Sequence, residues 1–437
     1  MPVGIYISVP FCRTKCSFCN FASDVFSKSA FENYVLRIIE DIADARRQAS
    51  QLGCALPHRA DSIYLGGGTP SILEPSQLAR IFAAVKSYFS IAPDCEITVE
   101  CAPGTISPSL IDTLIQCGVN RVSLGVQSFV DKEAKSVGRL HTRVMVLEEI
   151  QRLRDAGLSN ISIDLIAGLP HQTGETWKYS VAETIAAGVP HASVYMLEVD
   201  EESRLGSELL AGGARYHAHF VPDDDATADF YQQGCEMLEE AGLAQYEISN
   251  FARKDPASKE NYQSRHNLKY WIRDPYIGFG VDAHSMLERK SDAGSAAIPA
   301  IRANQEKPRE GTRFATPDSL GAYMNRAPNI VTPFDRESAI EEEFFLGLRL
   351  NRGVNIENLQ ASVRSPGSLE TSFESSEGPD FRHENAIRES IQDGLLEQQE
   401  SVLRLTARGR LLSNEVFARF LREVSGDQQR ESTLIGR

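Results

Sequence analysis

The chain opens with an apolar segment, VGIYISVP (Val3–Pro10), which runs directly into FCRTKCSFC (Phe11–Cys19). The second segment carries Cys12, Cys16 and Cys19 in a CxxxCxxC spacing, with no fourth cysteine close by. A structural zinc site takes four protein ligands, whereas a cubane iron-sulfur cluster held by three thiolates keeps one iron open for an exchangeable ligand. The spacing therefore favours a [4Fe-4S] cluster, with incomplete zinc ligation as the alternative.

Length and charge mainly exclude functions. The 437 residues suffice for two or three domains with a large core. The 45 Lys and Arg against 60 Asp and Glu give a net charge of -15, which argues against nucleic acid or an anionic membrane as the main partner. Met1 leads directly into a strand, and no apolar run approaches about twenty residues, so we expect no signal peptide and no transmembrane segment. These features predict a cytoplasmic protein, compatible with peripheral visits to a membrane.

Short apolar runs alternate with amphipathic stretches through the first half of the chain. Strands are expected at Val3–Val9, Ser62–Leu65, Glu96–Glu100, Arg121–Gly125, Ile161–Ile166 and Ala192–Leu197. Helices are expected at Phe31–Ala49, Gln77–Tyr88, Ser109–Cys117, Val144–Ala156 and Glu175–Ala186. Successive βα units predict an α/β fold with a parallel sheet curled into a barrel or part of one. Functional residues then lie near the C-terminal ends of the strands.

The pattern changes after about Pro222. Residues 228–240 read as one helix, and Tyr246–Ser285 is rich in aromatics, Asn and Gly, so a loop-dominated substrate region is expected there. The sequence after about residue 338 suggests a small, mostly helical, winged-helix-like domain. Its expected elements are helices at Ile340–Leu350 and Phe381–Leu396, a strand at Leu403–Thr406 and a helix ending near Leu421. Polar segments at 362–380 and 425–437 are expected to be mobile. The predicted organisation is a barrel with the cysteine loop (1–225), a loop-rich region (226–337) and a C-terminal domain (338–437).

Further motifs follow the expected strands. They are GGGTP (Gly66–Pro70), Glu100, GVQSF (Gly125–Phe129), Gly138-Arg139 and DLIAGLP (Asp164–Pro170). Together with the cysteines and Phe18, they resemble the radical S-adenosylmethionine superfamily, and within it the oxygen-independent coproporphyrinogen oxidase branch, over roughly residues 5–285. The resemblance implies a partial (β/α)6 barrel, a [4Fe-4S] cluster on the three cysteines, an electron donor for that cluster and bound S-adenosylmethionine.

The chemistry of S-adenosylmethionine assigns roles to these motifs. Glycines without a Cβ let the backbone approach the methionine amine, and the Arg139 fork suits its carboxylate. The side chains of Glu100, Gln127 and Asp164 can bond to the ammonium group or the ribose hydroxyls, although each alone could be an ordinary polar residue of a barrel rim. The family resemblance adds Tyr6 and Thr69. The expected pocket is Tyr6, Phe18, Gly67, Gly68, Thr69, Glu100, Gln127, Arg139 and Asp164, and no catalytic residue is assigned.

A second block narrows the resemblance. HNLKYW (His266–Trp271), preceded by YEISNFA (Tyr246–Ala252) and followed by GFGVDAHS (Gly278–Ser285), is similar to the HemW haem chaperones. The oxidase has a further cysteine where this chain has Phe21, and a substantial arm where eleven residues precede Cys12. The resemblance therefore implies a haem chaperone that delivers haem to an apo-protein, such as a respiratory enzyme. His266 is the expected axial haem ligand, and Tyr270 and Trp271 are expected to stack on the porphyrin.

Other interpretations stay open. His266 and its aromatic neighbours could pack a loop against the barrel mouth, with His266 bonded to a backbone carbonyl. The chain could be a radical enzyme that oxidises a porphyrinogen, or a cluster-bearing interaction protein that binds neither haem nor substrate. His284 is expected to be structural, His217 and His219 to lie in a solvated loop, and the remaining cysteines to be packing residues in a reducing compartment, namely Cys54, Cys95, Cys101, Cys117 and Cys235.

Overall fold

The computed structural model describes residues 1–254, 261–290, 310–357 and 384–420. Contacts within the chain divide it into two compact units, with a boundary between Asp335 and Arg336. Among the described residues, the first unit comprises those up to 335 and the second those from 336 onward. Each unit is described here by itself.

The first unit is built on a sheet of 12 strands in the order β12-β11-β10-β9-β1-β2-β3-β4-β5-β6-β8-β7. The six strands at its centre are parallel: β1 (Val3–Val9), β2 (Arg59–Gly67), β3 (Ser90–Cys101), β4 (Arg121–Gln127), β5 (Ile161–Ala167) and β6 (His191–Met196). The outer strands are β7 (Leu243–Gln245), β8 (Asn250–Arg253), β9 (Tyr276–Phe279), β10 (His284–Glu288), β11 (Gly311–Ala315) and β12 (Ile330–Phe334). The α/β class and the six expected parallel strands are therefore confirmed.

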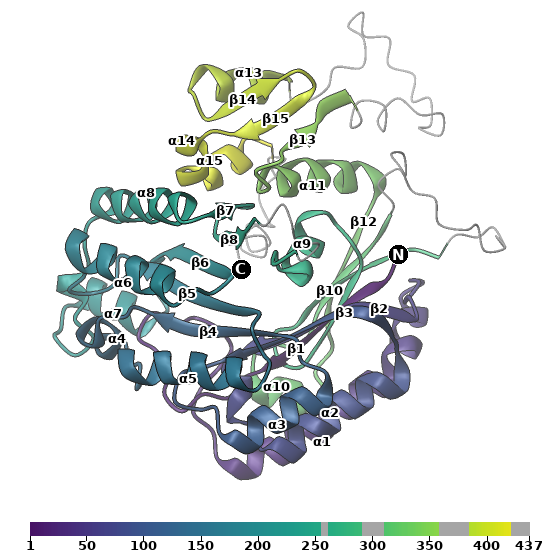
Figure 1. The fold of residues 1–437 in the computed structure, drawn as a ribbon. Helices are drawn as coiled ribbons and strands as arrows, with labels where there is room; N and C mark the ends of the chain where they lie inside the picture. The colour runs from purple at the N-terminus through teal and green to yellow at the C-terminus, as the bar shows by residue number, and fades with distance from the viewer. Residues whose placement is uncertain (255–260, 291–309, 358–383, 421–437) are drawn as a thin grey trace, which may run out of the picture. The chain divides into compact units, whose positions relative to one another are not determined.

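The helices that connect the parallel strands lie along the outer side of the curved sheet (Figure 1). They are α1 (Lys28–Gln51), α2 (Pro75–Tyr88), α3 (Pro108–Cys117), α4 (Asp131–Ser136), α5 (Arg143–Asp155) and α6 (Gly174–Ala186). After β6 follow α7 (Arg204–Ala211), α8 (Asp224–Glu240), α9 (Arg265–Trp271) and α10 (Leu320–Met324), and single 3-10 turns lie at Pro70–Ile72 and Ala218–Phe220. Side-chain caps mark where three of these helices begin. Thr142, Thr173 and Asp223 each accept a hydrogen bond from the backbone N–H three residues later, which caps α5, α6 and α8.

Apolar and polar side chains alternate along the strands, so the barrel has an apolar outer layer and a polar interior. Ile5 and Ile7 of β1 are fully buried, whereas Tyr6 between them stacks with Tyr64 of β2. Successive side chains of a strand point to opposite faces, so the same period places Glu100 and Asp164 inside the barrel. The sheet thus positions a set of polar groups that the outer helices do not reach.

The segment Tyr246–Ser285, expected to be loop-dominated, contains the short elements β8, α9 and β9 and the start of β10. Strand β9 pairs in parallel with β1, and β8 pairs antiparallel with β6. These elements span only four to seven residues each, too few to show a period in the sequence. Residues from 226 onward also contribute strands to the main sheet. The expected division of the chain into three parts stays a prediction.

The second unit contains α11 (Arg336–Leu348), β13 (Val354–Asn355), α13 (Glu384–Gln392), β14 (Leu396–Gln399), β15 (Val402–Leu405), α14 (Ala407–Leu411) and α15 (Ser413–Ala418). Its three strands form an antiparallel sheet in the order β13-β15-β14. The helix expected over Phe381–Leu396 instead ends at Gln392, where Gly394 adopts a positive φ of 69° and stops it. The helix expected to end near Leu421 is two short helices.

The segments 362–380 and 425–437, expected to be mobile, lie outside the described residues. None of the helices in the described part of the chain is long and apolar enough to span a membrane.

Candidate functional site

The cysteine loop follows β1 and is held by its own backbone. The Cys12 N–H donates to the Asp24 carbonyl at 3.0 Å, and the Cys19 N–H donates to the Cys16 carbonyl at 3.3 Å. A third bond joins the Ser17 N–H to the carbonyl of Val137, just after α4, at 3.2 Å. These backbone bonds set the path of the loop, which places the three cysteines after the C-terminal end of β1.

The surroundings of the thiols bear on their charge. Burial raises the pKa of Cys12 and Cys16, while the nearby Arg139 guanidinium acts in the opposite direction and favours the thiolate. The Thr69 hydroxyl lies 3.7 Å from the Cys12 sulfur and the Ser23 hydroxyl 3.9 Å from the Cys19 sulfur. Within the described residues, no three His, Cys, Asp or Glu side chains surround a single metal-ion position. A cubane does not require one, because each thiolate binds a different iron.

The glycine motif packs directly against the entrance of the cysteine loop. Gly68 N–H donates to the Val9 carbonyl at 2.8 Å, and a Cβ on Gly68 would lie 2.8 Å from that same oxygen. Gly67 has a φ of 100°, which side-chain-bearing residues rarely adopt. Both glycines are thus required by the close approach of β2 and the cysteine loop, and Thr69 N–H continues the contact to the Phe11 carbonyl at 2.8 Å.

Two buried polar atoms of the expected pocket residues lack a hydrogen-bond partner among the described residues. They are Gln127 Oε1 and Arg139 Nε. The two side chains approach each other over Gly125, where an added Cβ would lie 3.2 Å from an Arg139 nitrogen and 3.3 Å from the Gln127 amide nitrogen. Gln127 also has a φ of 68°, a conformation that costs a non-glycine residue stability. An acceptor beside a guanidinium fits the ammonium and carboxylate of an amino-acid ligand.

Glu100 and Asp164 supply two carboxyl groups inside the barrel. Burial raises the pKa of Glu100 to about 7, while a hydrogen bond of 2.7 Å from the Tyr64 hydroxyl to Glu100 Oε1 opposes the rise. Burial also raises the pKa of Asp164, which accepts a hydrogen bond from the Ser123 hydroxyl at 3.0 Å. Near neutral pH Glu100 is therefore poised between its two protonation states.

The remaining pocket residues fall into two groups. Tyr6 lies inside the barrel, 6.1 Å from Tyr64 between ring centroids. Phe18 instead packs against an apolar cluster made by Val137, Ile166 and Leu169, next to the cysteine loop. Any contact of Phe18 with a cofactor stays a prediction.

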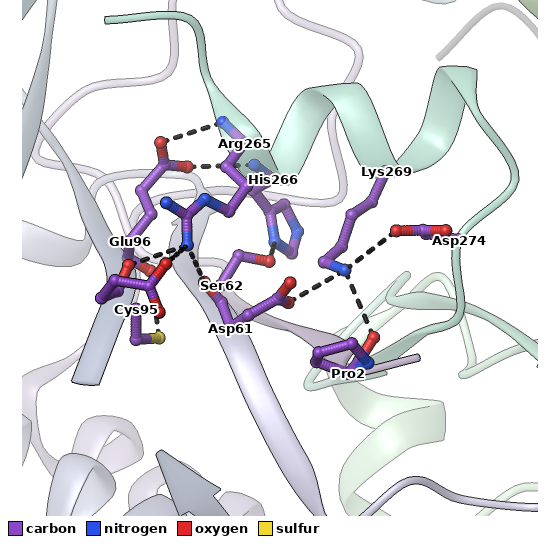
Figure 2. A network of polar contacts seen from close by, with 10 residues as sticks. Pro2, Asp61, Ser62, Cys95, Glu96, Arg265, His266, Lys269 and Asp274 are labelled. Atoms are coloured by element: carbon purple, nitrogen blue, oxygen red, sulfur yellow. Dashed lines mark hydrogen bonds and ion pairs between the residues drawn. The ribbon is translucent and has the colours of Figure 1, made fainter. Parts of the chain in front are cut away.

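The HNLKYW motif lies on α9, away from the cysteine loop. Helix α9 packs on β1, β2 and β3 at the level of Gly4, Ser62 and Glu96, which are register neighbours close to the N-terminal ends of β1 and β2. Figure 2 shows His266 and Lys269 projecting from the helix towards Ser62 and Asp61 of β2. The motif therefore sits at the end of the barrel opposite to the cysteines.

Both ring nitrogens of His266 have partners within the chain. Nδ1 lies 3.0 Å from the Ser62 hydroxyl and Nε2 lies 2.9 Å from the Tyr270 hydroxyl. The side chain is 1 % exposed, and burial, followed by the charge of Lys269, lowers its pKa to about 3, so the ring is neutral at pH 7. Among the described residues, the ring has no backbone-carbonyl partner of the kind considered from the sequence. Haem ligation by His266 stays a prediction, and it requires the ring to exchange one of these hydroxyls for iron.

The other histidines and cysteines lie largely as expected. His217 precedes a 3-10 turn rather than lying on a strand, and its ring is 3.4 Å from that of His171. His284 begins β10, 3.6 Å from the Asp282 carboxylate. Of the five remaining cysteines, four are buried and Cys235 is half-buried. Among these residues, Cys95 lies beside the motif helix, near Arg265 (Figure 2).

Comparison with known proteins gives the family. Residues 6–182 match the Radical SAM superfamily, and residues 334–412 match the HemN C-terminal domain. The chain is 31 % identical to "Heme chaperone HemW" of Lactococcus lactis over 96 % of this chain and 97 % of the relative. It is 30 % identical to "Heme chaperone HemW" of Bacillus subtilis over 96 % of this chain and 99 % of the relative. The chain belongs to the HemW heme chaperone family.

A solved structure agrees with the fold of this chain. Coproporphyrinogen III oxidase (HemN) from Escherichia coli, a radical SAM enzyme, superposes with a TM-score of 0.73 at 20 % identity, over 96 % of this chain and 90 % of that one. The match confirms the radical SAM barrel and the C-terminal domain expected from the sequence. At this identity it establishes the fold alone.

The sequence motifs do not include two interior residues, Tyr64 and Arg121. Tyr64 bonds to Glu100, and Arg121 of β4 is 2 % exposed and faces Glu100 and Asp164. Both lie on strands rather than after them. The available signal was the two-residue period, because Tyr64 precedes Gly66 by two positions and so shares its face of β2.

Proposed function

We propose that this chain carries a [4Fe-4S] cluster on Cys12, Cys16 and Cys19, binds S-adenosylmethionine beside it, and delivers haem to an acceptor protein. The observation that carries the proposal is its 31 % identity to a relative named heme chaperone over 96 % of the chain. The pocket geometry supports the two cofactors independently of that name.

The cysteine loop fits a cluster with one open iron. Three thiols lie on one short loop, and Arg139 favours the charged form of Cys12 and Cys16. When bound, such a cluster supplies one-electron chemistry. The chain's own contribution is to orient and shelter it: Thr69 donates toward the Cys12 sulfur, and the glycine motif closes the loop against β1.

The neighbouring residues fit S-adenosylmethionine. Arg139 Nε and Gln127 Oε1 are the partners that the methionine carboxylate and ammonium group need, and both atoms are buried without a partner in the described part of the chain. The carboxylates of Glu100 and Asp164 suit the ammonium group or the ribose hydroxyls, and Tyr6 adds a ring inside the barrel. An unpaired buried polar group costs about 1–3 kcal/mol, which a ligand would recover.

The proposed haem site lies on α9. His266, Tyr270 and Trp271 share α9, and the Tyr270 hydroxyl holds the nitrogen that would bind iron. Ligation through His266 Nε2 therefore requires Tyr270 to turn away, which would also free its ring to lie on the porphyrin. An electron donor for the cluster and a haem-accepting apo-protein, such as a respiratory enzyme, are the partners that this function needs.

An anaerobic haem titration of reconstituted protein tests the proposal, with the Soret band as readout. The variants are His266→Ala, a triple alanine variant of Cys12, Cys16 and Cys19, and His284→Ala as a matched histidine control. Saturable binding that weakens in His266→Ala, and survives in the triple variant and in His284→Ala, supports haem delivery with a separate cluster site. Absence of saturable binding in the parent contradicts it.

The oxidase alternative has its own readout. Reduced, cluster-loaded protein is incubated anaerobically with coproporphyrinogen and S-adenosylmethionine, and the products are analysed for new vinyl groups. Their formation would replace the chaperone proposal with a radical oxidase.

A further inference from the structure

The motif helix and the cofactor pocket meet at Tyr64. On one side the Tyr64 ring stacks with His266, at 5.3 Å between centroids and 26° between planes. Its hydroxyl reaches the other way and donates to Glu100 Oε1 at 2.7 Å. Tyr64 therefore touches both the helix at one end of the barrel and a carboxylate expected to bind the cofactor at the other.

Helix α9 is fixed firmly enough to hold this ring. The Glu96 carboxylate accepts hydrogen bonds from the backbone N–H groups of Arg265, at 2.9 Å, and His266, at 3.0 Å, and so caps the first turn (Figure 2). At the other end of the helix, the Lys269 ammonium lies 2.9 Å from Asp61 and 3.3 Å from Asp274. Tyr64 thus stacks on a ring anchored from both ends of its helix.

Glu100 depends on its neighbours for its charge. The titratable groups that face it from the surrounding elements are Tyr6 of β1, Tyr64 of β2, Arg121 of β4, Asp164 of β5, Tyr195 of β6 and Tyr270 of α9. Burial and Asp164 disfavour the Glu100 carboxylate, whereas the Tyr64 hydroxyl, the Gly67 backbone and Arg121 favour it. A hydroxyl donor both stabilises the charged form and fixes which way the carboxylate faces.

We propose that Tyr64 is a positioning residue for Glu100 and that His266 holds the Tyr64 ring in place, so that α9 controls the cofactor pocket from the opposite end of the barrel. The inference rests on the proposed function, because it takes Glu100 as a ligand of S-adenosylmethionine. It gives His266 a role that needs its ring but not a free ring nitrogen.

The direction in which pH changes the affinity for S-adenosylmethionine follows from the charge that Glu100 needs to bind it. Only the carboxylate accepts hydrogen bonds from an ammonium group through both oxygens, so affinity for S-adenosylmethionine falls as pH drops through the pKa of Glu100, about 7. Removing the Tyr64 hydroxyl raises that pKa further. The fall in affinity then begins at a higher pH, by about one unit, because a hydrogen bond to a charged group is worth about that much.

The experiment measures S-adenosylmethionine binding to cluster-reconstituted protein by anaerobic equilibrium dialysis across the neutral pH range. Tyr64→Phe should move the midpoint of the pH profile upward by about one unit. His266→Ala should move it in the same direction by less, whereas His266→Phe, which keeps a ring without nitrogens, should restore the parent profile. Tyr323→Phe is the matched control, since it also loses a tyrosine-to-carboxylate hydrogen bond, the partly buried 2.5 Å bond to Asp41 between α1 and α10.

The outcomes separate the two levels of the proposal. Binding in the parent with an unchanged midpoint in Tyr64→Phe overturns the inference and leaves the proposed function standing. No binding in the parent at any pH overturns both. A midpoint in His266→Phe that matches His266→Ala overturns the ring-holding role of His266.

A second measurement covers poor folding of Tyr64→Phe. The infrared carboxyl band that disappears in Glu100→Gln is titrated in the parent, in His266→Ala and in His266→Phe. A higher midpoint in His266→Ala, with the parent midpoint in His266→Phe, supports the proposal, and equal midpoints in all three overturn it.

Discussion

At the cysteine end of the barrel, Gln127 Oε1 and Arg139 Nε are buried with no partner among the described residues, whereas at the α9 end both nitrogens of His266 and the ammonium group of Lys269 are bonded within the chain. Leaving a buried polar atom unpaired costs about 1–3 kcal/mol, and a ligand bound at the cysteine end would pair these two atoms. Fully paired groups indicate anchoring. The two ends of the barrel therefore differ in how their buried polar groups are paired, although both ends were expected from the sequence to bind cofactors.

The largest expected effect concerns the cysteine end. Replacing Cys12, Cys16 and Cys19 together with alanine should abolish cluster uptake, so that iron after reconstitution falls from about four atoms per chain to none. Iron and sulfide analysis measures this. A variant in which the buried Cys54, Cys95 and Cys117 become alanine serves as control and should retain its iron. Full iron content in the first variant would contradict the cluster site.

The next effect tests the anchoring at the α9 end. Lys269→Ala leaves the carboxylates of Asp61 and Asp274 without their buried cation, and should lower the free energy of unfolding by about 3–5 kcal/mol. Lys28→Ala is the control, because Lys28 and its partner Glu74 are 85 % and 57 % exposed and such pairs contribute about 0–1 kcal/mol. Urea unfolding compares the two variants. Equal losses would show that α9 is not anchored through Lys269.

A smaller effect concerns pH. The pKa of Glu100 is about 7 in the folded protein against an ordinary 4.5, so the folded state binds this proton more tightly than the unfolded state. The free energy of unfolding of the cofactor-free protein should therefore fall by about 3 kcal/mol as pH rises from 4.5 through 7. Glu100→Gln should lose this fall and gain stability over the parent at pH 8 but not at pH 5, as measured by urea unfolding.

The control for this comparison is Glu175→Gln, which changes a carboxylate that is 91 % exposed and should keep the pH dependence of the parent. A parent-like pH dependence in Glu100→Gln would mean that Glu100 is not an acid with a raised pKa.

The smallest expected effect tests whether the backbone conformation of Gln127 lowers the stability of the cofactor-free protein. Gln127→Gly relieves the positive φ and should stabilise the cofactor-free protein by about 1 kcal/mol, while weakening S-adenosylmethionine binding through loss of the amide. Thermal unfolding and equilibrium dialysis measure the two changes. Gln127→Asn tolerates this backbone conformation better than Gln and should fall between the parent and the glycine variant in stability. A stability loss in Gln127→Gly would show that the conformation is not strained.

Much of the fold could be predicted from the hydrophobic periods of strands and helices and from the spacing of the motifs. The six parallel strands and their connecting helices lie close to their expected positions, because buried β-runs and amphipathic helices carry their period in the chain itself. The cysteine loop and the glycine motif were also correctly placed after β1 and β2, since βα units bring strand ends to one edge. Short elements such as α9 and β9 were not predicted, because seven and four residues are too few to show a hydrophobic period.

The sequence by itself determined the parallel barrel, the cysteine triad and the polar residues suited to S-adenosylmethionine, because these depend on local spacing and on side-chain chemistry. Only the tertiary structure decided that His266 is neutral and bonded to Ser62 and Tyr270, and that Tyr64 links it to Glu100. The physical reason is distance along the chain. Partners 204 residues apart, such as Ser62 and His266, meet only when β9 pairs with β1 and brings α9 against the barrel.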